Sequence, residues 1–146
     1  MTLSLSLSHD TSSSLCFLSL EDRHSINMFA GCTTGWTQFN GKCYIYEPRS
    51  MTYAEKNCQN KGANLASVHS DEEYKHLQNV VYQATNANGQ AWIGGSDCQQ
   101  KGVWFWSDGT TFDYAKWCRG QPDNFGGNQG CAYMNYGGIS LKCPQH

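Results

Sequence analysis

The sequence lacks long apolar runs, clusters of basic residues and closely spaced cysteine pairs. No stretch approaches the roughly eighteen apolar residues that a membrane-spanning helix needs, so we expect no membrane anchor. The formal net charge is -2 and Lys and Arg form no run, which argues against nucleic acid and anionic membranes as partners. No Cys-x-x-Cys pair is present to indicate zinc or thiol-redox chemistry.

The motifs of common enzyme classes are also missing. The five histidines include no His-Glu-x-x-His, and there is no Gly-x-Ser-x-Gly elbow and no phosphate-binding glycine loop. No pair of acids stands beside a catalytic histidine. We therefore predict that the protein is not an enzyme.

Cysteine, in contrast, is abundant, with eight residues in a chain of 146. So many cysteines in a small chain indicate a disulfide framework built in an oxidising compartment, and we expect a secreted, extracellular protein. The length, with 39% hydrophobic and 13% aromatic residues, suits one domain with a real core. The sequence leaves the oligomeric state open.

The N-terminal segment, residues 1–31, does not resemble the rest. Leu alternates with Ser at its start, and the short apolar run at residues 15–20 is preceded by no Lys or Arg, which makes a poor signal peptide. Its Ser-rich composition favours a flexible segment. We therefore expect a flexible segment over residues 1–31 and a folded domain over residues 32–146.

Two helices are predicted in the first half of that domain. Residues 52–58 form the first, which Gly62 is suited to end. The second begins at Ser70, with Glu73 three residues on as in a capping box. Its apolar face carries Tyr74, Leu77 and Val81. Beyond residue 84, turn residues and short aromatic strands take over, and helices followed by strands predict an α+β fold.

Residues 117–124, Trp-Cys-Arg-Gly-Gln-Pro-Asp-Asn, carry the chemistry of most interest. Calcium takes six to eight oxygen ligands, and the Gln121 amide and the Asp123 carboxylate are both of that type. Pro122 fixes φ between them and holds their spacing. The tripeptide alone is also common in ordinary turns, so its surroundings decide its meaning.

Those surroundings resemble the C-type lectin domain. Residues 35–44 (Gly-Trp-Thr-Gln-Phe-Asn-Gly-Lys-Cys-Tyr) look like its opening hairpin, and residues 63–70 (Ala-Asn-Leu-Ala-Ser-Val-His-Ser) like the link between its helices. Residues 91–95 (Ala-Trp-Ile-Gly-Gly) look like its central strand. Residues 104–110 (Trp-Phe-Trp-Ser-Asp-Gly-Thr) look like the strand and turn before its binding loop. The four matches occur in family order, over about residues 32–138.

Two further cysteines narrow the resemblance. Cys98 and Cys118 are most similar to the fish branch, which holds galactose-type lectins and type II antifreeze proteins. The resemblance implies a C-type-lectin-like α+β fold, with two helices packed on antiparallel strands, a long irregular binding-loop region and disulfide staples. It implies calcium-dependent binding of galactose-type glycans, since Gln-Pro-Asp accompanies galactose in that family. A type II antifreeze-like, ice-binding protein is the alternative.

The resemblance also assigns site residues. The metal ligands would be Gln121, Asp123 and Gln129, and the sugar would contact Gln121, Asp123, Asn124 and Phe125. The family has Glu where this chain has Gln129, and the Trp-Asn-Asp strand that supplies the remaining ligands is absent. One carboxylate is a poor charge count for a calcium site, so we expect weak calcium binding.

Several of these residues have structural alternatives. Tryptophans bury large apolar areas, so Trp92, Trp104, Trp106 and Trp117 are expected to anchor the core and not to serve as sugar platforms. Asn124 and Asn128 are more typical of turns. Phe125 could either stack on a sugar or pack internally, and the sequence leaves this open.

For the cysteines, the resemblance implies a disulfide between Cys32 and Cys43. It would also join Cys58 to the last cysteine of the domain and Cys131 to one shortly before it. Only Cys143 follows Cys131 in this sequence, so at least one of those partners is missing. The expected disulfide set is Cys32, Cys43, Cys58, Cys98, Cys118, Cys131 and Cys143, with the pairing beyond the first pair open.

Overall fold

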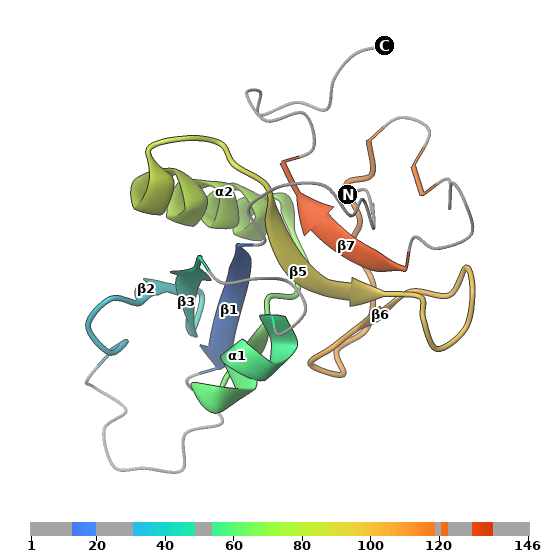
Figure 1. The fold of residues 1–146 in the computed structure, drawn as a ribbon, viewed down its shortest axis with the longest axis horizontal. Coiled ribbons are helices and arrows are strands. Elements are labelled where there is room, and N and C mark those ends of the chain that lie inside the picture. Colours follow the sequence, from blue (N-terminus) through green and yellow to red (C-terminus); the bar gives the residue numbers. More distant parts are fainter. Residues whose placement is uncertain (1–12, 20–30, 49–53, 119–120, 123–129, 136–146) are drawn as a thin grey trace.

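A mixed sheet with two helices forms the described part of the protein, a computed structural model in which residues 13–19, 31–48, 54–118, 121–122 and 130–135 are described. The sheet has the order β2-β3-β1-β5-β6, with β4 paired to β1 and β7 paired to β5. Helix α2 packs beside β2 and β3, and α1 beside β1 and β4 (Figure 1). The elements are β1 (Ser14–Ser19), β2 (Thr37–Phe39), β3 (Lys42–Glu47), α1 (Ala54–Asn60), β4 (Asn64–Leu65), α2 (Asp71–Thr85), β5 (Ala91–Ser96), β6 (Phe105–Trp106) and β7 (Cys131–Met134).

Strand β1 is the main departure from the sequence-based expectation. Residues 1–31 are predicted to be flexible, but Ser14–Ser19 pair antiparallel with β3 along their whole length and meet β5 in parallel at Ser14 and Trp92. Figure 1 shows β1 in the middle of the sheet. It lies beside the opening hairpin formed by β2 and β3. The remaining strand pairs are antiparallel, as expected.

The alternation of side chains along β1 explains why this segment is ordered. Leu15 and Phe17 point into the main core, which includes the apolar face of α2. Cys16 and Leu18 point into a second cluster that contains Cys58 of α1. A strand buried on both faces needs a continuous apolar run, and full burial of each such side chain contributes about 1.5–3 kcal/mol.

Helix α2 begins as its sequence predicts. The Ser70 hydroxyl accepts the backbone N–H of Glu73 at 3.1 Å, while the Glu73 carboxylate accepts the N–H of His69 at 2.7 Å, one residue before the cap. The expected apolar face is buried, with Leu77 and Val81 fully so. In α1, the described helix covers Ala54–Asn60, and Gly62 follows it with a φ of +71°.

Two disulfides join described cysteines. Cys32 is bonded to Cys43, as the resemblance implies, and Cys58 is bonded to Cys16. Cys118 is also disulfide-bonded, whereas Cys98 and Cys131 carry free thiols. The expectation that these two belong to the disulfide set is therefore not met. Cys143 lies outside the described residues.

Candidate functional site

The predicted binding loop begins at Gln121, which is half-buried and donates its backbone N–H to the carbonyl of Cys118 at 2.9 Å. The peptide bond between Gln121 and Pro122 is cis. Cys118, just before the loop, is buried. The other predicted site residues lie outside the described part of the chain: Asp123, Asn124, Phe125 and Gln129.

An aromatic cluster supports the segment that leads into the loop. The Trp104 ring centroid lies 4.8 Å from that of Trp117, and Trp106 stacks on Phe112 at 4.6 Å. Phe112 in turn stacks near Trp117 at 6.3 Å. Trp106 is buried, while Trp104 and Trp117 are partly buried and pack against the main core. These tryptophans are therefore anchors, as expected, and they fix the position of Cys118 next in the chain.

Trp92 is placed differently from the other three. It is partly buried on β5 and meets Tyr133 of β7 edge-on at 5.2 Å between ring centroids. This is a cross-strand pair in register, of the kind that stabilises an antiparallel ladder. Trp92 therefore also has a structural role.

The two glycines of β5 let this cluster sit close to the sheet. A Cβ atom on Gly95 would lie 3.2 Å from the Trp106 ring and 3.3 Å from that of Phe112. On Gly94 it would lie 2.5 Å from the Ser107 hydroxyl and 3.0 Å from the backbone oxygen of Leu65. Only the absence of a side chain permits these approaches, so the Gly-Gly pair sets where the segment after β6 crosses the sheet.

A polar network joins the segment after β6, residues 107–118, to residues 66–70, which link β4 to α2. The Ser67 hydroxyl donates to the Asp108 carboxylate at 2.6 Å, and Thr110 donates to the same carboxylate at 2.6 Å. His69 contacts Asp113 through Nδ1 at 2.7 Å. Its Nε2 lies 3.1 Å from the Ser67 hydroxyl. The link and the segment are thus held together by side chains on both sides.

Ser67, His69 and Asp113 have the connectivity of a hydrolytic triad, but they cannot act as one. Ser67 is 1% exposed, so a substrate cannot reach its oxygen. Its proton is directed at Asp108, and not at the imidazole that would have to remove it. The arrangement is a structural brace.

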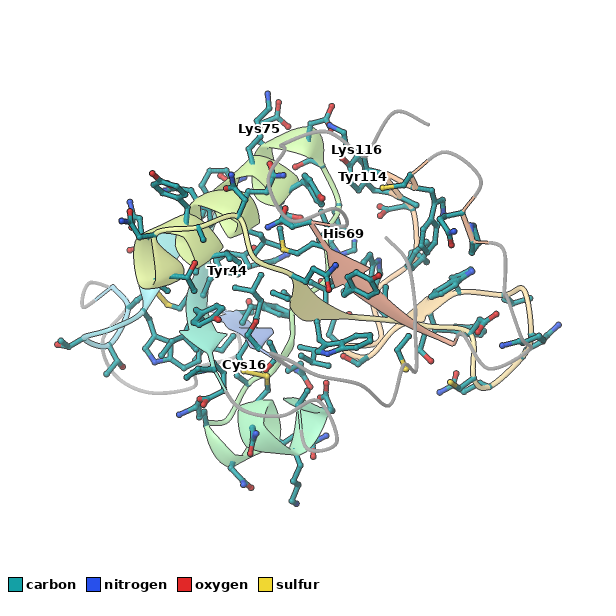
Figure 2. All side chains as sticks on the ribbon, turned by 45° about the horizontal axis from the view of Figure 1, so that its top comes forward. Cys16, Tyr44, His69, Lys75, Tyr114 and Lys116 are labelled. Carbon is teal, nitrogen blue, oxygen red and sulfur yellow. A yellow bond between two sulfur atoms is a disulfide. The ribbon has the colours of Figure 1, made fainter. Side chains whose placement is uncertain are left out.

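A second tether joins the segment to the start of α2. Tyr114 donates its hydroxyl proton to Asp71 at 2.7 Å, and the Lys116 ammonium donates to the same oxygen at 3.2 Å. These hydrogen bonds, with that of Tyr114 the stronger cause, lower the pKa of Asp71. The hydrogen bond from His69 likewise lowers the pKa of Asp113. Figure 2 shows Tyr114 and Lys116 close to this helix, on the side where Lys75 projects.

The residues at hand do not make a good calcium site. Within the described ranges, no three His, Cys, Asp or Glu side chains gather in a way that could hold a metal ion. The predicted donor set of Gln121, Asp123 and Gln129 carries one formal charge. A hard dication loses much hydration energy on binding, and neutral amides replace it poorly. The donor chemistry of this chain fits weak and not tight calcium binding.

The family is decided by comparison with known proteins. The model of the lectin C-type domain matches residues 47–143. The chain belongs to the C-type lectin family. This is a carbohydrate-binding family and not an enzyme family, in agreement with the absence of catalytic motifs. In the described part of the chain, neither helix combines the length and apolarity needed to cross a membrane.

Its relatives include both lectins and antifreeze proteins. Ladderlectin of Oncorhynchus mykiss is 48% identical over 107 residues, or 72% of this chain and 56% of that protein. The galactose-specific lectin nattectin of Thalassophryne nattereri is 38% identical, covering 75% of this chain and 70% of its own length. The type-2 ice-structuring protein of Osmerus mordax is 42% identical, and the match covers 73% of this chain and 59% of that protein. The chain thus spans less than two thirds of two of these three relatives.

Solved structures give the same picture. A calcium-dependent type II antifreeze protein in its calcium-free form superposes with a TM-score of 0.66 at 39% identity, covering 73% of this chain and 83% of its own. The carbohydrate-recognition domain of the human scavenger receptor C-type lectin superposes with a TM-score of 0.62 at 30% identity. The match covers 75% of this chain and 86% of that domain.

Sequence reasoning missed two features of this region. It left Cys16 without an assigned partner, although an apolar run of this length between polar stretches is typical of a buried strand. It also missed the brace in which Ser67 contacts Asp108 and His69 contacts Asp113. No local pattern links either pair, because the partners are 41 and 44 positions apart and meet only in the fold.

Proposed function

We propose that this chain is an extracellular glycan-binding protein that recognises galactose-type sugars at the loop beginning at Gln121, with calcium assistance that is weaker than in a lectin with a full ligand set. The Gln-Pro-Asp tripeptide carries this proposal. Nattectin, one of the relatives, is a galactose-specific lectin by name, which supports the sugar class.

The surroundings of Gln121 support a binding role. The aromatic cluster and the polar brace hold the segment of residues 107–118 on two sides, so the loop that follows starts from a fixed point. Loops positioned by a rigid scaffold commonly carry binding residues. A rigid base also lowers the entropy lost when a ligand is bound.

The second candidate function is ice binding. Its support is that structures of type II antifreeze proteins cover more than 70% of this chain at TM-scores above 0.6. An ice-binding surface would be flat and would bear threonines. Thr110 and Thr111, next to the brace, are exposed.

The test is retention on galactose-agarose in calcium, compared with the chelator EGTA and with mannose-agarose. We expect weak retention on galactose alone, abolished by Asp123→Ala and strengthened by Gln129→Glu, which restores a carboxylate. Calorimetry on the same variants reports calcium binding directly. Micromolar calcium affinity of the unaltered chain, lost in Asp123→Ala, would show that the missing ligands matter less than argued.

Thermal hysteresis separates the two candidates. The galactose proposal expects none above a control protein of equal concentration. Hysteresis without galactose retention, reduced by Thr111→Leu, would favour ice binding. Equal retention on galactose and mannose would contradict the assigned sugar class.

A further inference from the structure

Two free thiols face each other where β5 ends and β7 begins. Cys98 is exposed in the turn after β5, and Cys131 is the first residue of β7. The strands bring them together, because Ser96 pairs with Cys131 and the N–H of Asp97 donates to the carbonyl of Gly130 at 3.1 Å. They belong to neither described disulfide.

The contact between the two cysteines is close. The Cys98 thiol donates to the Gly130 carbonyl at 3.3 Å and also hydrogen-bonds with the Cys131 thiol. A Cβ atom on Gly130 would lie 2.6 Å from the Cys98 sulfur, so a side chain at that position would displace it. Gly130 therefore leaves the space in which one sulfur reaches the other.

The turn that presents Cys98 is held by its own hydrogen bonds. The N–H of Cys98 donates to the Ser96 hydroxyl at 3.1 Å. Asp97 is buried, and its carboxylate accepts the N–H of Gly102 at 2.9 Å and the Lys101 ammonium at 3.5 Å. Cys98 is thus held beside Gly130 and Cys131 before any reaction occurs.

We propose that Cys98 and Cys131 form a reactive dithiol site for low-molecular-weight disulfides of the glutathione class, with Cys98 as the attacking thiol and Cys131 as the resolving thiol. The exposed position of Cys98 suits the first role, since a small disulfide can approach it from solvent. Cys131 is half-buried and contacts Cys98, which suits the second.

The reaction proceeds by two exchanges. The Cys98 thiolate attacks one sulfur of the small disulfide, forms a mixed disulfide and expels one small thiolate. The Cys131 thiolate then attacks the Cys98 sulfur and expels the second. The protein loses two protons and two electrons, and the small disulfide is reduced to two thiols.

The environment of Cys131 favours this order. Burial, followed by the neighbouring Cys98, raises the pKa of Cys131 to about 11. Once Cys98 is in a mixed disulfide it no longer carries a thiolate, so its contribution to that raised pKa disappears. Cys131 becomes easier to ionise after the first step, when it is needed. The product joins the turn after β5 to the start of β7.

The experiment treats the full-length chain, with its two described disulfides intact, with oxidised glutathione, and maps cysteines by mass spectrometry of non-reduced peptides. We expect a Cys98–Cys131 peptide and no lasting glutathione adduct. Cys131→Ser should trap one glutathione on Cys98. Cys98→Ser should leave Cys131 largely unmodified. Two free thiols after treatment, or a stable adduct on Cys98 of the unaltered chain, would overturn the proposal.

Gly130→Ala tests the geometry separately from the chemistry. The added methyl group should push the Cys98 sulfur away and slow closure by on the order of tenfold, so that the adduct on Cys98 accumulates transiently. Tryptophan fluorescence and circular dichroism check that the variant is folded. Closure at an unchanged rate would contradict the role given to Gly130, and if this variant does not fold, the adduct trapped by Cys131→Ser decides the assignment.

Discussion

Cys16 of β1 is disulfide-bonded to Cys58 of α1, across 42 residues of sequence and with 5.3 Å between their Cα atoms. The family relationship predicts that Cys58 pairs with a cysteine at the end of the domain. The structure instead gives it a partner from the N-terminal side. Cys58 is therefore disulfide-bonded although its partner differs from the expected one. The partner, Cys16, lies on β1, which pairs with β3 of the opening hairpin.

Replacing both cysteines of this disulfide with serine should lower the free energy of unfolding by about 2–5 kcal/mol. The same replacement of Cys32 and Cys43, which close 11 residues, should cost about 1 kcal/mol less, because loop-closure entropy grows with loop length. Urea unfolding under non-reducing conditions measures both. Equal stabilities of the first double variant and the unaltered chain would contradict the pairing.

Phe17 tests whether β1 belongs to the core. Its side chain is 5% exposed and lies 6.1 Å from the Tyr44 ring between centroids. Phe17→Ala should cost about 3–5 kcal/mol of stability, as expected for a buried aromatic residue. Val103→Ala, at a position that is 40% exposed, is the control and should change stability by less than about 0.5 kcal/mol. A flexible N-terminal segment would give no effect in either variant.

Tyr44 carries a buried hydroxyl that has no hydrogen-bond partner among the described residues. Burial, with smaller effects of the Glu73 and Asp108 carboxylates, raises its pKa well above the usual range. Because an unpaired buried hydroxyl loses its hydration without compensation, Tyr44→Phe should leave stability unchanged or raise it by about 1 kcal/mol. Chemical denaturation measures this, and a loss above that size would reveal a partner for the hydroxyl.

The tether at Asp71 should weaken in acid. The folded-state pKa of Asp71 is lower than its ordinary value of 3.8, so the ionised carboxylate stabilises the fold above that pH. This contribution is lost as the pH falls from 3.8 through the lowered pKa. Carboxyl NMR titration should place the Asp71 midpoint below 3.8.

Tyr114→Phe is the matched variant for this titration. It removes the larger cause of the shift, so the Asp71 midpoint should rise toward its ordinary value while Lys116 keeps part of the effect. The Asp113 midpoint, which depends on His69, should stay where it is. If the Asp71 midpoint does not move, the hydrogen bond from Tyr114 does not hold in solution.

Much of the fold could be predicted because its signals are local. The cap at Ser70 and the apolar face around Leu77 specify α2 within fifteen residues. The Gly-Gly pair at residues 94–95 marks a strand that other groups approach closely. The Cys32–Cys43 disulfide, which the family resemblance implies, joins the segment before β2 to β3 over only 11 residues.

What the sequence could not specify depends on distant partners. The apolar run of β1 fits a failed signal peptide as well as a buried strand, and the choice is made by β3 and β5, which come 28 and 77 residues later when counted from Ser14 to Lys42 and Ala91. Likewise, the sequence does not show that Cys98 and Cys131 are free thiols, because this depends on where the fold places the cysteines. Of the predicted ligands, Gln121 lies in the described part of the chain and Asp123 does not, so the sugar assignment stays a proposal.

The position of β1 has a consequence for the maturation of this protein. A leader peptidase that cut after Ser19 would remove the strand between β3 and β5 and leave Cys58 without its partner. Processing that is compatible with this fold must therefore leave Ser13 onward in place. An affinity tag or fusion partner joined at the N-terminal side likewise has to precede Ser13, whose carbonyl accepts the N–H of Trp92 at 2.9 Å.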